Sequence, residues 1–400
     1  MNKNTNKLWL MGLTLLTLLP FYSCNNAEYS SLDNRLFLAE TATSSNARKK
    51  ITIDDQGANV TATVRSSNPA GQDVKVTLVA DPAALEAYNK RNSTNFVALP
   101  VENFKLDQTE IVIKKGETLA PTVNITLKGL SKEMVETGNQ YALALTAKPI
   151  DGTDVTVIDG ANTIIYQIDQ VIVTSVPVLG TDPKTGVYHS ASAPLAKDLV
   201  LSAWTVEMRV NMSGFQRNNQ ALFGIWGPDS EIYMRFGDAP TPFNTLQVKF
   251  AGSQFDRSIK EFEPNTWYHI AVTYDGSIFT LYINGEEDVN TDKWPGKVTT
   301  ARDKIYIASS GREWFVNGCM MSEVRLWNIS RTKEQIINNQ YTINPKTEGL
   351  IMYWKMNEGQ GHELKNSVSG APNLIIEPST PLRWLDNVRS DNKGRINFND

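Results

Sequence analysis

Carboxylates and histidines are the residues of this chain that could do chemistry, and their spacing fits no catalytic site that we considered. Cleavage of a glycosidic bond with retention needs two carboxylates about 5 Å apart, and residues i and i+2 of a strand share one side at roughly 7 Å. Glu286 and Asp288 form the only Glu-x-Asp pair, and Asn290 stands where a Glu-x-Asp-x-Glu strand would have its last acid. We therefore predict no catalytic residues.

The three histidines are isolated as well. His189, His269 and His362 have no His or Cys at the spacing of metal ligands. His269 stands two residues after Trp267 in an alternating pattern, which favours a structural role. The sequence has no Gly-x-Ser-x-Gly, phosphate-loop or dinucleotide motif. A formal net charge of -4 provides no polycation, so we expect no nucleic-acid partner.

The N-terminus has the pattern of a secretory signal. Lys3 and Lys7 precede an uncharged run over 8–22, which is shorter than the ~20 residues that cross a bilayer. Ser23 and Cys24 follow, and a small residue before cysteine resembles a bacterial lipobox. The resemblance implies a signal peptide over 1–23 and lipidation of Cys24. We therefore expect an outer-membrane lipoprotein of the cell envelope, anchored through its N-terminal lipid and facing either the surface or the periplasm.

Tryptophan divides the rest of the chain into two regions. Of nine Trp residues, eight stand at or after Trp204, and none lies between Cys24 and Ala203. In the first region, which we place at 24–170, short apolar pieces alternate with turn signals, as in a β-sandwich. We expect strands at 35–38, 58–64, 74–79, 110–113, 122–127, 141–146 and 163–168.

One helix interrupts these strands. Asp81 and Pro82 form an N-cap followed by proline at the first helical position, and Leu85 and Tyr88 give the helix one apolar face. Leu85, Tyr88-Asn89, Leu99-Pro100 and the strand leading to Gly116 resemble a Bacteroides-type immunoglobulin-like family of unknown function. Members of that family typically follow a lipobox and precede a glycosidase or a lectin-like domain. The resemblance implies an immunoglobulin-like sandwich that acts as a spacer.

A segment with several turn residues follows the first region. Pro177, Gly180 and Pro183 interrupt residues 171–183, so we expect a linker there. We place the second domain at 184–388 and a C-terminal tail at 389–400.

The second region has longer strand patterns that are richer in aromatic residues. Apolar and polar residues alternate over 204–210, 232–236 and 246–250. They also alternate on both sides of Asp275 and Gly276, turn residues that predict a hairpin there. Antiparallel strands of this kind bury one face and leave the other in water. We therefore expect a wet face that carries, among others, Glu207, Arg209, Tyr233, Arg235, Gln247 and Lys249.

An ordered set of motifs in this region resembles the concanavalin A-like LamG/pentraxin-type jelly roll. The matching residues are Trp267-Tyr268-His269, Tyr274-Asp275-Gly276, Leu281 to Gly285, Gly318, Glu323 to Asn328, Tyr353-Trp354 and Asn357 to Gly359. The resemblance implies an all-β chain: an immunoglobulin-like sandwich followed by a concanavalin A-like jelly-roll sandwich. The stretch from Phe315 to Glu323 is one residue longer than the family pattern, which predicts a β-bulge.

The fold named by this resemblance includes lectins and glycosidases, so a glycan is the expected partner. Flat aromatic rings and planar polar groups suit sugar recognition. The candidates are three loop tryptophans, one loop arginine and a patch on the wet sheet face: Trp226, Trp294, Trp314, Arg312, Tyr233, Arg235 and Lys249. LamG-like domains often hold Ca²⁺, for which suitable loop acids are Asp182, Asp198, Asp238 and Asp292, although none is assigned as a ligand.

Together these patterns predict a non-catalytic glycan-binding lipoprotein that takes part in glycan utilisation. A protein-binding adhesion module is the first alternative. A glycoside hydrolase on the concanavalin A-like fold is the second.

Overall fold

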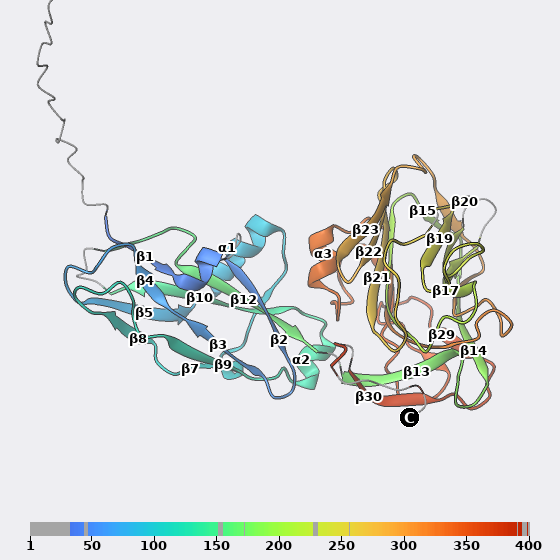
Figure 1. Cartoon of the computed structure of the whole chain (residues 1–400), viewed down its shortest axis with the longest axis horizontal. Helices are drawn as coiled ribbons and strands as arrows, with labels where there is room; N and C mark the ends of the chain where they lie inside the picture. The colour runs from blue at the N-terminus through green and yellow to red at the C-terminus, as the bar shows by residue number, and fades with distance from the viewer. Residues whose placement is uncertain are drawn as a thin grey trace, which may run out of the picture.

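The computed structural model describes residues 33–43, 47–150, 155–171, 173–226, 231–255, 257–389, 391–393 and 398. These residues form two β-rich domains side by side (Figure 1). The expected signal peptide and Cys24 lie outside the described residues. Among the described helices, none is both long enough and apolar enough to cross a bilayer.

The first domain is a sandwich whose two layers enclose one apolar core. One layer is a sheet in the order β2 (Arg48–Ile53), β12 (Thr163–Gln170), β10 (Tyr141–Pro149), β5 (Val74–Ala80), β8 (Glu110–Ile113), with β6 (Val97–Ala98) on β10. The other layer contains two small sheets, β3 (Ala58–Ala62), β9 (Val123–Leu127), β7 (Phe104–Leu106) and β11 (Thr156–Val157), β1 (Arg35–Leu38), β4 (Val64–Ser66). Alternation along β9 buries Val123, Ile125 and Leu127 against this core.

Six of the seven strands expected in the first domain are present with small shifts at their ends, whereas the strand expected at 58–64 is divided into β3 and β4, which belong to different sheets. Helix α1 (Pro82–Asn92) also forms as predicted: the Asp81 carboxylate accepts from the Ala84 N–H at 3.1 Å, and Leu85 and Tyr88 are buried. The sequence patterns did not predict β2, β6, β7 and β11, the short helix α2 (Lys132–Glu136), or the 3-10 turns η1 (Ala39–Thr43) and η2 (Val101–Asn103).

The second domain is a sandwich of two large sheets, which are joined where β13 pairs with β14. We call the first the open sheet: β14 (Tyr188–Pro194), β25 (Lys304–Ile307), β17 (Gln220–Ile225), β18 (Ile232–Phe236), β19 (Leu246–Phe250), β20 (Ser253–Gln254), with β29 (Leu374–Glu377) on β14 and β28 (Glu363–Leu364) on β29. We call the second the covered sheet: β13 (Val173–Thr181), β26 (Gly318–Trp327), β16 (Trp204–Met212), β21 (Tyr268–Tyr274), β22 (Phe279–Ile283), β23 (Glu286–Thr291), with β27 (Leu350–Trp354) and β30 (Trp384–Arg389) at its margins. A small ladder joins β15 (Leu199–Leu201) and β24 (Thr299–Ala301). The fully buried Trp204, Phe250 and Leu281 lie in the core between the two sheets.

The hairpin expected around Asp275 and Gly276 is confirmed. Strands β21 and β22 pair from Ile270 with Ile283 to Tyr274 with Phe279. The Asp275 carboxylate accepts from the N–H groups of Ser277 and Ile278, and Gly276 takes a φ of 98° that suits glycine. The hairpin is part of the frame.

The structure has a strand where the sequence predicted a linker. Residues 173–181 form β13, which pairs with β14, β26 and β30 and buries Val176, Val178 and Leu179. Pro177 and Gly180 are accommodated within this strand because Gly180 takes a φ of 67°. In the expected tail, Phe398 is 1% exposed and packs with β13 and β26 residues.

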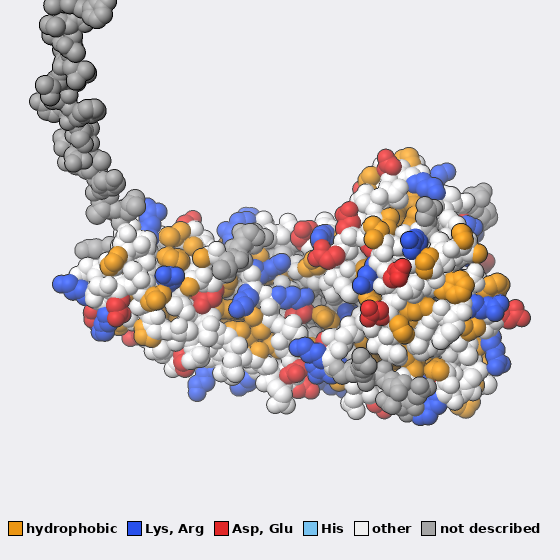
Figure 2. Space-filling view, in the orientation of Figure 1, with side chains coloured by type: hydrophobic (Ala, Val, Ile, Leu, Met, Phe, Trp, Pro, Cys, Tyr) orange, Lys and Arg blue, Asp and Glu red, His pale blue; other side chains and the backbone are white. Residues whose placement is uncertain are grey.

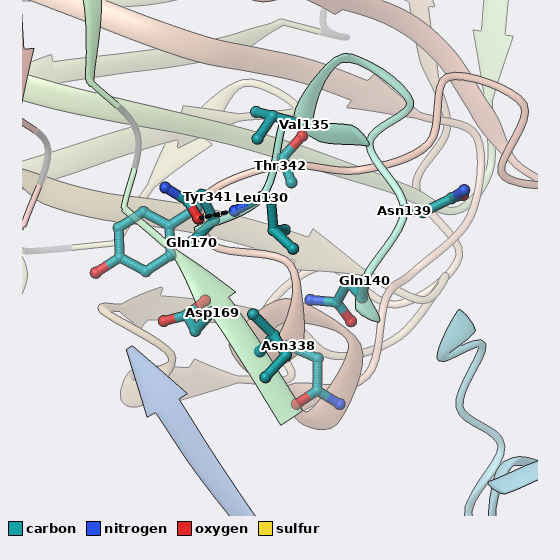
Figure 3. A pocket seen from close by; sticks show the side chains of 10 residues that line it. Leu130, Val135, Asn139, Gln140, Asp169, Gln170, Asn338, Tyr341 and Thr342 are labelled. Carbon is teal, nitrogen blue, oxygen red and sulfur yellow. Dashed lines mark hydrogen bonds between the residues drawn. The ribbon is translucent and has the colours of Figure 1, made fainter. Parts of the chain in front are cut away.

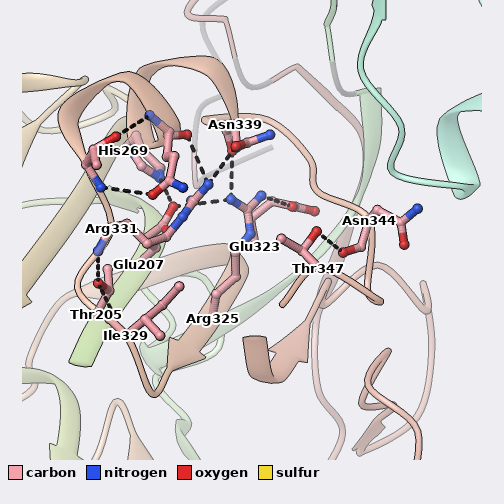
Figure 4. Close-up of polar contacts among 12 residues, drawn as sticks. Thr205, Glu207, His269, Glu323, Arg325, Ile329, Arg331, Asn339, Asn344 and Thr347 are labelled. Carbon is pink, nitrogen blue, oxygen red and sulfur yellow. Dashed lines mark hydrogen bonds and ion pairs between the residues drawn. The ribbon is translucent and has the colours of Figure 1, made fainter. Parts of the chain in front are cut away.

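The outward face of β16 is not in water, contrary to the expectation. Residues 329–341, which we call the covering segment and which include helix α3 (Lys333–Asn338), cover this face (Figure 1). Glu207 and Arg325 are 0% exposed, and Arg331 from the covering segment lies 2.6 Å from the Glu207 carboxylate. The alternation of β16 therefore marks a second, charged interior surface, whose polar contacts appear in Figure 4.

Each charge in this buried cluster has a partner. Glu207 also lies 3.3 Å from Arg325 and 3.3 Å from Nε2 of His269. Burial alone would raise the pKa of Glu207, but Arg331, His269 and Arg325 hold it well below its usual range. Burial lowers the pKa of His269 to about 4 in spite of the carboxylate beside it. A neutral histidine in contact with an ionised glutamate is therefore part of the folded state.

The predicted bulge lies in β26. Glu207 pairs with Arg325 while Arg209 pairs with Ser322, so β26 has one extra residue at this point. Glu323 takes a φ of 56° there, and its carboxylate lies 2.5 Å from both Arg325 and the Tyr353 hydroxyl. The bulge thereby places a carboxylate and a guanidinium next to each other on the covered face.

The two domains are in direct contact. Val171 and residue 172 alone separate β12 from β13. Arg48 donates to Asn338 at 3.3 Å, and Asn344 donates to Asn139 at 2.9 Å. At Gly138 a Cβ atom would lie 2.0 Å from the backbone oxygen of Ile343, so only glycine permits this approach. The first domain is therefore fixed against the second.

Candidate functional site

The outward face of the open sheet carries the exposed aromatic group that best suits ligand binding. Trp226 follows β17 directly and is 43% exposed. Its ring centroid lies 4.8 Å from that of Tyr233, with 39° between the ring planes. A Cβ atom on Gly224 would lie 3.3 Å from the indole nitrogen, so the indole folds back over this glycine. We call Trp226, Gly224, Tyr233 and Arg235 the platform.

The register of the open sheet explains this position. Ser192 pairs with Tyr306, Tyr306 with Gly224, Gly224 with Tyr233, and Tyr233 with Lys249. These five residues therefore form one row across the outward face. Gly224 is the member without a side chain, and the indole of Trp226 occupies the space above it.

Three polar contacts hold the Arg235 side chain of the platform in one position. Its Nε donates to Gln247 at 2.7 Å, one terminal nitrogen donates to Asn219 at 3.0 Å, and the other lies 2.6 Å from the Asp238 carboxylate. The Tyr233 hydroxyl donates to the same Asn219 oxygen at 2.9 Å. These contacts fix both side chains before any ligand arrives.

Tyr233 is the buried tyrosine of the platform, and its ring packs against that of Trp226. It was expected on a wet face, and the register does place it on the outward side, but Trp226 leaves it only 7% exposed. Burial raises the pKa of Tyr233 to about 12, so its hydroxyl stays protonated at neutral pH. Lys249, the next residue in the row, is paired with Glu231 at 3.1 Å.

Trp314 is the second exposed tryptophan among the candidates. It is 38% exposed, and the guanidinium of Arg217 lies 4.9 Å from the centre of its ring. Arg312 is exposed two residues earlier in the same loop. These side chains belong to the loops that border the start of β17, whereas Trp226 lies at its end.

Trp294 is not available to a ligand, so the expectation that it lies exposed in a loop is wrong. It is 2% exposed, and its indole nitrogen donates to Ser253 at 2.6 Å. The ring packs edge-on against Phe250 and Phe279 at 5.6 and 5.2 Å. The turn folds back because the Tyr274 hydroxyl binds the Trp294 carbonyl at 2.5 Å.

The loop acids considered for calcium have other partners. Asp182 accepts two bonds from Arg383 at 2.9 and 2.7 Å, and Asp238 binds Arg235. Within the described parts of the chain, no three His, Cys, Asp or Glu side chains come together as metal ligands. Asp292 is exposed and Asp198 lies 3.4 Å from Arg302. None of these positions is assembled as a calcium site.

The one Glu-x-Asp pair lies on β23 at the margin of the covered sheet. Glu286 binds Lys333 at 2.7 Å, and Asp288 accepts from the backbone of Ile259 and Lys260. Each acid therefore holds a neighbouring segment of the chain.

A small pocket lies between the domains, and its walls combine apolar and polar side chains (Figure 3). It is lined by Leu130, Val135, Asn139, Gln140, Ile168, Asp169, Gln170, Asn338, Tyr341 and Thr342. Asp169, whose pKa burial raises, is paired with Lys50 at 3.1 Å. Arg48 and Asn344 engage Asn338 and Asn139 across the contact. These groups join the domains, so we assign the pocket to the interface.

The surface charges near these sites are mixed. Lys and Arg are interspersed with Asp and Glu over the face of both domains seen in Figure 2. This face therefore shows no broad field of one sign.

Sequence reasoning missed several residues of the site. Gly224 and Tyr306, which lie beneath and beside the Trp226 ring in the row, and Asn219, which holds Arg235, were not singled out. Gln247, which also holds Arg235, was expected on a wet face but is 1% exposed. One signal was present: a glycine inside a strand often marks the close approach of another group. The loop-to-strand contacts of Asn219 have no such signal in the sequence.

Comparison with known proteins agrees with this architecture. Residues 185–337 match the family model of the concanavalin A-like lectin/glucanases superfamily. The second domain is a concanavalin A-like domain. Residues 32–154 match another family model, which is described only as an N-terminal domain.

Two solved structures show how far the likeness extends. Over 89% of its length the chain resembles 99% of a proposed carbohydrate-binding protein from Bacteroides ovatus, with 23% identity and a TM-score of 0.52. Over 51% of its length it resembles 94% of a heptameric SAP-like pentraxin from Limulus polyphemus, with 16% identity and a TM-score of 0.35. The first likeness shows that the two-domain fold is shared, and the second is too distant to support an argument. No curated protein matches the chain.

Proposed function

We propose that this protein binds glycans without cleaving them, and that its concanavalin A-like domain does so at the platform. The observation that carries the proposal is Trp226, a tryptophan 43% exposed that lies back over Gly224 and against Tyr233. The family match of this domain and the description of the Bacteroides ovatus relative support the same ligand class.

The physical argument begins with the shape of a sugar ring. A pyranose presents a patch of C–H groups on one face and hydroxyls at its edge. An indole offers a large flat apolar surface, and amide or guanidinium groups beside it bond to hydroxyls. At the platform the ring is Trp226, and Arg235 and Asn219 lie around Tyr233, against which the indole packs.

Rigidity of the site favours binding. Side chains that are ordered only on binding cost about 0.5–1.5 kcal/mol each. Tyr233 and Arg235 are already fixed by Asn219, Gln247 and Asp238. Little ordering is left for the ligand to impose.

We further propose that the chain acts in the cell envelope as a lipoprotein of a glycan utilisation system. The basic start, the short apolar run and Cys24 support this location. The first domain, fixed against the second through Arg48 and Asn139, then holds the binding domain away from the anchor.

The test is a glycan array followed by calorimetry on each hit. Trp226→Ala is expected to weaken binding of a mono- or disaccharide about tenfold or more, since ~1.4 kcal/mol corresponds to a factor of ten. Trp314→Ala is the matched control, because it removes the same side chain at 38% exposure and leaves the platform intact. Glycan binding that is unchanged in Trp226→Ala would refute the proposal. Release of reducing ends from the bound glycan would replace it with the hydrolase alternative.

A further inference from the structure

A second exposed tryptophan, Trp314, borders the same face of the open sheet as the platform. We define the rim loop as residues 309–317. The backbone of Ser309 donates to Ala221 at 3.2 Å, and the Ser310 hydroxyl accepts from Ala221 at 3.1 Å. These bonds tie the rim loop to the start of β17, the strand whose end carries Trp226.

Tyr188 shows on which face of the sheet the rim loop lies. Tyr188, Ser190 and Ser192 alternate with buried residues along β14, so all three share the outward face with Tyr306, the partner of Ser192. The Tyr188 hydroxyl donates to Ala308 at 2.6 Å and accepts from the Gly311 N–H at 3.0 Å. The rim loop therefore borders the same outward face as the platform.

Buried amides hold the rim loop in place. Asn317 is 6% exposed, and its backbone N–H donates to the Gln220 side chain at 3.1 Å. Its side chain binds Gln216, both through the Gln216 N–H at 3.0 Å and through the Gln216 amide oxygen. Arg217, the next residue, lies over Trp314 at 4.9 Å. Trp314 is thus presented on a fixed loop.

Asn219 connects the platform with the residues that contact Trp314 of the rim loop. It lies two residues after Arg217, takes a φ of 62°, and accepts bonds from both Tyr233 and Arg235 of the platform. One short segment, 217–219, therefore connects the residue stacked on Trp314 with the residues that support Trp226.

The space between the two tryptophans suits a chain of sugars. From Asn219 to Gly224, over which the Trp226 indole lies, the chain advances about 16 Å at ~3.3 Å per residue, the length of about three linked hexoses. Beside β17, Tyr306 of β25 and Ser190 and Ser192 of β14 point outward and are partly exposed hydroxyl bearers. Gly224 adds no side chain of its own to this face.

We infer that the platform is one end of an extended site that runs along β17 to Trp314, and that its ligand is a linear oligosaccharide long enough to stack on both tryptophans. This inference rests on the proposed function of the platform. The two contacts are linked through one ligand, so the second forms at high effective concentration once the first is made. Affinity should therefore rise with chain length until the ligand spans the face.

The test is calorimetry with cello-, xylo-, manno- and laminari-oligosaccharides from disaccharide to hexasaccharide. For the series that binds, the hexasaccharide is expected to bind the wild-type chain about tenfold more tightly than the disaccharide. Trp314→Ala is expected to abolish this gain. Arg217→Ala, which keeps Trp314 and removes its stacked guanidinium, is expected to reduce the gain.

The two hypotheses fail in different ways. Equal affinity for short and long ligands, or a length gain that survives Trp314→Ala, overturns the extended site while the loss in Trp226→Ala still upholds the platform. If Trp226→Ala leaves every length unaffected, both the platform and the extended site are wrong. Equal melting temperatures of wild type and variants exclude unfolding as the cause of either result.

Discussion

Replacement of Gly224 by valine tests whether the position of the Trp226 ring over the sheet matters for binding, while the other residues of the site are kept. A Cβ atom at Gly224 would lie 3.3 Å from the indole Nε1, 3.6 Å from Cε2 and 3.6 Å from Cβ of Tyr306. The γ-carbons of valine reach a further bond length of about 1.5 Å, into the volume that the ring occupies. The indole must then leave its position over the sheet.

The expected effect is on binding rather than on folding. Gly224 lies in β17 and its φ is outside the left-handed region, and valine is favoured over glycine in strands. We therefore expect Gly224→Val to keep or slightly raise the melting temperature. Loss of the stacked geometry should weaken glycan binding about tenfold, or ~1.4 kcal/mol. Gly224→Ala, which needs a shift of only a few tenths of an ångström, should have a smaller effect.

A double-mutant cycle gives the decisive form of this experiment. If Gly224 acts only through Trp226, Gly224→Val should add nothing to the loss already caused by Trp226→Ala, since residues in contact are not additive. Calorimetry on the four proteins measures this coupling. Undiminished affinity of Gly224→Val, or strictly additive losses, would show that the seat of the indole has no part in binding.

Three other outcomes are expected, two from the structure and one from the proposed lipidation of Cys24. His269 has a pKa of about 4 in the folded chain, against an ordinary value of 6.5. As the pH falls below 6.5, the histidine is therefore protonated in the unfolded chain before it is protonated in the folded chain. The free energy of unfolding is expected to fall by ~3 kcal/mol between pH 6.5 and pH 4. Denaturant titrations should show a weaker pH dependence over this range in His269→Gln, and an unchanged slope would contradict the neutral buried histidine. Trp294→Ala should cost ~3–5 kcal/mol of unfolding free energy through lost core packing, and a cost below 1 kcal/mol would contradict its burial. Cys24→Ala should abolish incorporation of labelled fatty acid and release the chain from the membrane fraction; labelling that persists would place the lipid elsewhere.

Much of the frame could be predicted from local pattern. Strands 110–113, 232–236 and 246–250 have the predicted bounds, because each alternates cleanly and is bounded by turn residues. The cap at Asp81 and the turn at Asp275 depend on side chains bonding to their own neighbours, so sequence alone sufficed for both.

The errors arose where distant segments decide burial. Glu207 alternates like a solvent-facing residue, but the covering segment brings Arg331 onto it from far along the chain. Residues 173–181 contain Pro177 and Gly180, yet the strand pairs with β26 and β14. Local composition contains no information about either partner.

The candidate site was predicted only in part for the same reason. Trp226, Trp294 and Trp314 all stand among turn residues, so the sequence could not rank them. Ser253 and Phe250 decide that Trp294 is core, whereas the absence of a side chain at Gly224 leaves Trp226 on the surface. Ranking them required the three-dimensional register.

A crystal structure of the chain with a bound oligosaccharide tests the central claim most directly. The account predicts one sugar ring stacked on the exposed face of Trp226, with its hydroxyls within hydrogen-bonding distance of Arg235 or Asn219. A ligand bound in the pocket between the domains, or at the covered sheet, with nothing on Trp226 would contradict it.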